Sequence, residues 1–194
     1  MREPCFIALA ASLLALAGCG GLDLAASAPP RLSGPKGFPI AVTGAAVGSL
    51  NAAVPFERRA IQAALPGFQL KDIRAYAQGA EKPALGAFEN GVQVLQIFPD
   101  ASKRRIGEIH AVRETVTGPT GERVGGSFAE AGARLSCRPG SGEYRGLVLC
   151  SSAAAPNVAL IYSVPDYQGL DGRLPPADRL AKAVLQQIVW QPQA

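Results

Sequence analysis

Glu108 and His110 are the side chains whose types and spacing come nearest to a catalytic arrangement. His110 is the single histidine of this 194-residue chain, and it follows Glu108 by two positions in a segment typical of a β-strand. Alternation along a strand would place both side chains on one face, close enough to share a hydrogen bond or a proton. Because a serine–histidine–acid site needs one histidine, a hydrolase that uses His110 is one hypothesis. No serine stands in a Gly-x-Ser-x-Gly sequence, however, and a structural histidine is the alternative.

Other sequence patterns that mark catalysis, metal binding or cofactor binding are absent. The chain contains neither Gly-x-x-x-x-Gly-Lys-Ser/Thr nor Gly-x-Gly-x-x-Gly before a helix, and it lacks His-Glu-x-x-His. His110, Cys137 and Cys150 supply too few ligands for a structural zinc site, which takes four. We therefore predict no catalytic residue, no metal and no cofactor, and a protein that is not an enzyme.

The tetrad Leu16-Ala17-Gly18-Cys19 points to a covalent modification. Residues 6–17 form an apolar run that is too short to span a bilayer and is typical of a secretory signal. The tetrad resembles the lipobox of bacterial lipoproteins, in which the cysteine thiol takes a diacylglycerol and a peptidase cuts before it. We predict a signal peptide over residues 1–18 and lipidation of Cys19. The alternative is an ordinary signal peptide, cut after Ala-x-Ala.

Two cysteines remain once Cys5 leaves with the signal and Cys19 becomes the anchor. Cys137 and Cys150 form an even pair in an oxidising compartment, so we predict a disulfide. A redox pair is the alternative, but such pairs usually show Cys-x-x-Cys spacing. The bridge would close a short ring and stabilise the fold by roughly 3 kcal/mol in the chain-entropy model.

The net charge of +4 does not indicate nucleic-acid binding in an exported chain. The basic clusters are short, and they fit either a solvated face or contact with anionic envelope material such as lipopolysaccharide phosphates or lipid headgroups. The loop between the paired cysteines holds charged residues and a tyrosine, which suits recognition. The predicted partner surface comprises Arg104, Arg105, Arg138, Tyr144 and Arg145.

The elements that would position these residues alternate between strand and turn. We predict an acylated anchor and flexible tether over residues 19–39 and a single α+β periplasmic domain over residues 40–194. Helical periodicity predicts an N-terminal helix over 55–65 and a C-terminal helix over 177–189. Strand-like segments separated by turn residues, with Asn90-Gly91 as a hairpin signal, predict an antiparallel sheet of several short strands between them. Both helices would pack on that sheet.

Part of the chain is similar to a known family. The segments are Val47-Gly48-Ser49-Leu50, Pro55-Phe56, residues 61–68, residues 105–109 and residues 125–128, followed by the two cysteines and Ile161-Tyr162. This pattern resembles the YfeY-like bacterial outer-membrane lipoproteins. The resemblance implies regulation by an envelope-stress sigma factor and implies no catalytic residues.

These features together indicate a membrane-anchored periplasmic lipoprotein with a non-enzymatic binding or structural role in envelope homeostasis. Gly20 after the anchor, where inner-membrane retention signals have aspartate, favours the outer membrane. The expected partners are the membrane, through the lipid anchor, and another envelope protein or an anionic envelope component. The alternatives are the His110-dependent hydrolase and an inhibitor of a hydrolase such as lysozyme. Since lysozymes are basic, such an inhibitor would need segregated charges.

Overall fold

The structure is a computed structural model that describes residues 39–131, 134–169 and 172–193. The predicted signal peptide, Cys19 and nearly all of the tether lie outside the described residues. Within the described ranges, no helix has both the length and the apolar character needed to cross a membrane.

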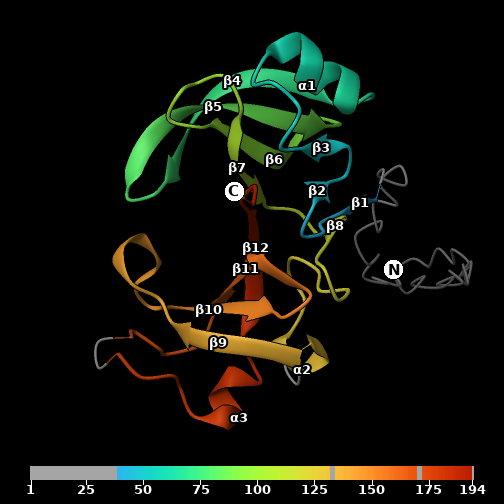
Figure 1. Cartoon of the computed structure of the whole chain (residues 1–194). Helices are drawn as coiled ribbons and strands as arrows, with labels where there is room; N and C mark the ends of the chain where they lie inside the picture. Colours follow the sequence, from blue (N-terminus) through green and yellow to red (C-terminus); the bar gives the residue numbers. More distant parts are fainter. Residues whose placement is uncertain (1–38, 132–133, 170–171, 194) are drawn as a thin grey trace, which may run out of the picture. The chain divides into compact units, whose positions relative to one another are not determined.

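An eight-stranded antiparallel sheet dominates the fold (Figure 1). It consists of two meanders of four strands each. The first meander contains β4 (Gln69–Ala77), β5 (Ala80–Glu89), β6 (Val92–Pro99) and β7 (Ile106–Ala111). The second contains β9 (Leu135–Pro139), β10 (Leu147–Ser152), β11 (Ala155–Ser163) and β12 (Val184–Trp190).

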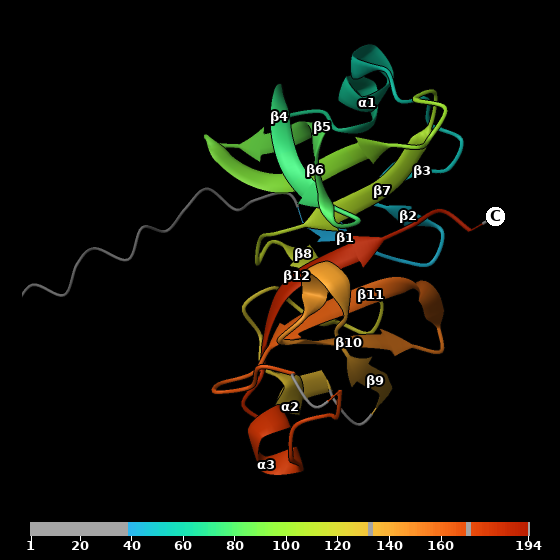
Figure 2. The same ribbon diagram turned by 90° about the vertical axis from the view of Figure 1, so that its left-hand side faces the viewer.

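The last strand of each meander pairs with the last strand of the other. The sheet order is therefore β4-β5-β6-β7-β12-β11-β10-β9. The pairing between β7 and β12 joins Ile109, His110 and Ala111 to three residues of β12. This short ladder is the junction between the meanders, visible as the crossing from yellow-green to red in Figure 1 and Figure 2.

Short elements flank the sheet. Strand β1 (Ile40–Ala41) pairs in parallel with β8 (Val116–Thr117), and β2 (Ala46–Val47) pairs with β3 (Leu50–Asn51). The helical segments are α1 (Arg58–Ala64), α2 (Phe128–Ala131), η2 (Gly142–Tyr144) and α3 (Ala177–Leu180). Helix α1 lies against the first meander, whereas α2 and α3 lie at the far end of the second (Figure 2).

The prediction of an α+β domain with a helix at each end is wrong, because the described chain is mostly β. The N-terminal helix is present but short, as α1. The expected C-terminal helix over 177–189 ends after one turn, and its remainder is β12 in the middle of the sheet. Apolar residues spaced by four suggested a helix there, yet Val184–Trp190 contains several β-branched residues and pairs with both β7 and β11, and its last three residues are buried on both faces of the sheet.

The main core lies on one face of the sheet. Alternate residues of the central strands point into it, among them Leu95, Ile97, Ile109 and Ile188, and α1 contributes Ile61. The opposite face carries two smaller apolar clusters, one on each meander. A charged and polar pair, Glu108 and His110, lies on this second face between the two clusters.

Candidate functional site

Glu108 and His110 form a buried pair on β7. Their strand alternates, so Ile109 points into the main core and the pair points to the opposite face. Only 2% of Glu108 and 1% of His110 are exposed. His110 Nε2 donates to Glu108 Oε1, which is the shared hydrogen bond expected from the alternation.

Two amide side chains from distant segments complete the surroundings of Glu108. Gln78, in the turn between β4 and β5, donates through Nε2 to Glu108 Oε2 at 2.9 Å. Gln191, directly after β12, donates to the same oxygen at 3.1 Å. Burial alone would raise the pKa of Glu108, but the hydrogen bonds and charge of His110, with those two amides, hold it below its ordinary value. The carboxylate is therefore ionised, and both of its oxygens accept hydrogen bonds.

The other ring nitrogen of His110 has no hydrogen-bond partner among the described residues. The ring stacks at a tilt against Phe98, with centroids 4.8 Å apart. In a serine hydrolase, one nitrogen accepts from the nucleophile and the other donates to the acid. Here Nε2 contacts the acid and no serine in the described chain bonds to Nδ1, so the observed arrangement positions the ring without a nucleophile.

Hydrogen bonds to a residue of the second meander stabilise the turn that carries Gln78. Gln78 and Gly79 both have positive φ, 53° and 77°, as a type I′ hairpin turn requires. Such a conformation is uncommon for glutamine, and a carboxylate stabilises it: Glu143 in η2 accepts from the backbone N–H of Gln78 at 2.8 Å and of Gly79 at 2.7 Å. The approach of the η2 loop to this turn is visible in Figure 1 and Figure 2.

Tyr144 follows Glu143 and is half-buried in the apolar cluster of the second meander. Burial, together with the negative charges of Glu143 and Glu108, raises the pKa of this phenol. The phenol of Tyr144 is therefore neutral.

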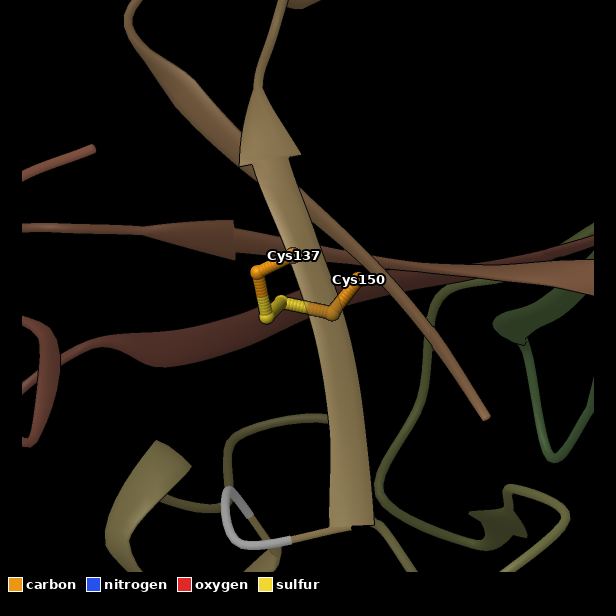
Figure 3. Close-up of a disulfide and its surroundings, with 2 residues drawn as sticks. All are labelled: Cys137 and Cys150. Atoms are coloured by element: carbon orange, nitrogen blue, oxygen red, sulfur yellow. A yellow bond between two sulfur atoms is a disulfide. The ribbon is translucent and has the colours of Figure 1, made fainter. Parts of the chain in front are cut away.

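A disulfide joins Cys137 of β9 to Cys150 of β10 (Figure 3). The two residues stand directly opposite each other in the β9–β10 ladder, with Cα atoms 4.1 Å apart. The bridge closes the loop that contains η2. It thereby restricts the segment from which Glu143 reaches the β4–β5 turn.

An open groove lies where β5 and β6 separate. Their ladder begins at Leu85, which pairs with Ile97, whereas residues 80–84 of β5 pair only with β4. Pro83 and Pro99 stand at the point of separation, and neither has a backbone N–H to donate across the gap. Proline thus explains locally why the two hairpins diverge.

This groove has a volume of about 1020 Å³, the upper end for small-molecule sites. Its apolar lining comes from β5, the end of β6, the β6–β7 turn, the segment before α1 and the C-terminal segment: Phe56, Pro83, Ala84, Leu85, Pro99, Ala101 and Pro192. Gln78 and Gln191 line it as well. Since both amides bond Glu108, the buried pair lies directly behind the groove wall.

Among the described residues, some charged side chains of the groove have a partner that neutralises or stabilises them, and others do not. Arg58 pairs with Asp72 at 2.7 Å. The Asp100 carboxylate accepts from the Ser102 hydroxyl and from the backbone N–H groups of Arg104 and Arg105. The hydrogen bond from Ser102, above all, lowers the pKa of this carboxyl. Lys82 bonds the neutral amide oxygen of Gln78 at 2.8 Å, and Lys103 makes no ion pair within the described residues. In the part of the chain that the structure describes, the ammonium groups of Lys82 and Lys103 therefore lack a carboxylate partner.

The predicted partner surface falls into two places. Arg104 and Arg105 are exposed in the β6–β7 turn beside α1, where the backbone oxygen of Arg104 accepts from Phe56. Arg138 is exposed on the edge strand β9, and Tyr144 and Arg145 belong to the η2 loop. The groove runs between these places, because its lining includes Lys103 of the β6–β7 turn and Gln78, which η2 contacts.

Sequence reasoning missed Gln78, Lys82 and Gln191 as site residues, and it placed Lys103 only in a short basic cluster with Arg104 and Arg105. Gln78 carries the clearest signal, because Gln-Gly between two strand-like segments is a hairpin turn that favours positive φ. Pro83 inside a strand pattern also indicates an edge or a break in pairing. Nothing local marks Gln191. Across the described residues, no group of three or more His, Cys, Asp or Glu is arranged to hold a metal ion.

Comparison with known proteins gives this chain a family and a similar solved structure. No curated protein matches the sequence. Among solved structures, the crystal structure of the uncharacterized protein yfeY from Escherichia coli has a similar fold, with a TM-score of 0.61 and 22% identity. The match covers 77% of this chain and 98% of that chain, and it supports the resemblance to YfeY-like proteins at the level of the fold. The model of a family described as "Protein of unknown function (DUF1131)" matches residues 33–192, so the chain belongs to the DUF1131 family.

Proposed function

We propose that this protein is a lipoprotein of the bacterial outer membrane that faces the periplasm and has a non-enzymatic binding role in envelope homeostasis. Cys19 would carry the lipid anchor, and residues 20–39 would tether the domain. The lipobox-like tetrad that ends at Cys19 supports the anchor. The Cys137–Cys150 disulfide supports an oxidising compartment, since such bridges are rare in the cytosol.

The observation that carries the binding role is the groove between the β4–β5 and β6–β7 hairpins. It is large enough for a ligand, and its apolar walls carry two ammonium groups that pair with no carboxylate of the described residues. The titratable pair behind it is engaged by internal donors rather than directed at the groove. Such an arrangement suits capture of a ligand better than conversion of one.

We also propose that the protein acts when the envelope is under stress. The resemblance to the stress-regulated YfeY-like lipoproteins supports this context. The partners would then be the membrane, through the anchor, and an anionic envelope component in the groove.

The anchor can be tested by metabolic labelling with an alkyne fatty acid in cells that express the full chain. We expect label on the unchanged protein and none on Cys19→Ser, which would also leave the outer-membrane fraction. Cys5→Ser is the matched control, because that thiol leaves with the signal peptide and its loss should not reduce labelling. Label that persists in Cys19→Ser would exclude the proposed anchor.

A further inference from the structure

We propose that the groove binds an anionic phospholipid, with an acyl chain between the apolar walls and the phosphate paired with Lys82 and Lys103. The inference rests on the proposed envelope location, where phospholipid is at hand. It adds to the proposed function the chemical class of the ligand.

The shape and walls of the groove favour an acyl chain. The cleft lies where two hairpins separate, so it is open at the surface rather than enclosed. Phe56 precedes α1, Leu85 lies in β5 and Pro99 in β6, and all three contribute apolar surface to one space. Because apolar surface in contact with water is unfavourable, an apolar occupant gains free energy by covering it.

The charges favour an anionic headgroup. The Arg58 guanidinium is already paired with Asp72, and the Asp100 carboxylate is occupied by the turn that it stabilises. Lys82 and Lys103 remain without a carboxylate partner in the described chain. A phosphate oxygen paired with an ammonium forms a charge-assisted hydrogen bond, which is stronger than a neutral one.

The same walls disfavour a peptide that would add as a strand. An extended peptide between β5 and β6 would require N–H donors from both sides of the gap. Pro83 and Pro99 remove two of those donors at the point where the strands separate. Free inorganic phosphate would match the lysines but would leave the apolar walls uncovered.

The test uses the full-length protein in nanodiscs of phosphatidylcholine, with a photoreactive palmitoyl lysophosphatidylglycerol as the probe. We expect mass spectrometry to find cross-links on peptides that contain Phe56, Leu85 or Pro99. The matching lysophosphatidylcholine probe should reach the same cross-linking yield only at about tenfold higher concentration, since it carries no net negative charge. Inorganic phosphate should not displace the anionic probe.

Two variants locate the headgroup and the chain separately. The double variant Lys82→Gln/Lys103→Gln should lower the cross-linking yield of the anionic probe about tenfold. The control Lys182→Gln changes an exposed lysine outside the groove and should leave that yield unchanged. Ala101→Trp should fill the groove and reduce cross-linking of both probes. Ala153→Trp is its control, an exposed alanine in the β10–β11 turn. Unchanged thermal unfolding must accompany each variant.

Cross-links that avoid groove peptides, or that Ala101→Trp leaves unchanged, would overturn the phospholipid proposal. Equal yields for the two probes would overturn the role of the lysines. The anchor is judged independently from the mass of the Cys19 peptide. An acylated Cys19 without groove cross-links contradicts the ligand alone, and groove cross-links on a protein with unmodified Cys19 contradict the anchor alone.

Discussion

The two four-stranded meanders have the same order of strands but different means of keeping their shape. The second, β9 to β12, is stapled between its first two strands by the Cys137–Cys150 disulfide. The first, β4 to β7, has no such bridge, and its ladder opens between β5 and β6 beyond Leu85. The groove lies in the meander that opens.

Hydrogen bonds from the second meander support the first, in which the ladder opens. Glu143, from the loop closed by the disulfide, bonds the β4–β5 turn. Gln78 in that turn then reaches Glu108 at the junction, and so does Gln191 beyond β12. The stapled meander thereby supports one wall of the groove. A site that needs an opening in a sheet can thus take its rigidity from the neighbouring part of the fold.

Removal of the Glu108 carboxylate, at the junction of the two meanders, should have the largest effect on stability. Glu108→Ala would leave His110 and the two glutamine amides without their acceptor in a buried position. We expect the free energy of unfolding to fall by about 4 kcal/mol, as for other broken buried pairs. Denaturant unfolding followed by circular dichroism measures it.

The control for that variant is Glu114→Ala, which removes an exposed glutamate and should change stability by less than about 0.5 kcal/mol. Equal stability of the two variants would mean that the pair contributes nothing at the junction.

Loss of the disulfide should have the second-largest effect. The cysteines are 13 positions apart, and Cys137→Ala/Cys150→Ala should lower the free energy of unfolding by about 3 kcal/mol in the chain-entropy model. Hydrogen exchange should accelerate in β9 and β10 and also at the amides of Gln78 and Gly79, because Glu143 depends on the closed loop.

Reduction of the unchanged protein with dithiothreitol should reproduce both results. If exchange at Gln78 and Gly79 stays slow while β9 and β10 loosen, the two meanders are not coupled through the η2 loop.

The contact made by Glu143 should have the smallest effect on stability. Glu143→Gln keeps the shape of the side chain but replaces charge-assisted hydrogen bonds with neutral ones, so we expect a loss of about 1 kcal/mol. The expected signature is faster hydrogen exchange confined to the β4–β5 turn, with the β9–β10 ladder unaffected. Glu114→Gln serves as the isosteric control, and a turn equally protected in both variants would refute the proposed support.

Parts of the site could be predicted from the sequence because they depend on neighbours along the chain. Alternation along one strand places Glu108 beside His110, and elimination leaves Cys137 to pair with Cys150. Asn90-Gly91 forms its hairpin turn because both residues take the positive φ, 51° and 79°, that such a turn needs.

The tertiary structure alone decided the rest. Residues 184–190 fit both a helical and an extended pattern, and the gap between β7 and β11 selects the strand. The groove draws Lys82, Lys103 and Gln191 from segments far apart in the chain, and Glu143 meets Gln78 from 65 positions away. Local sequence determines turns, alternation and the cysteine pair, whereas contacts between distant segments depend on how the two meanders pack.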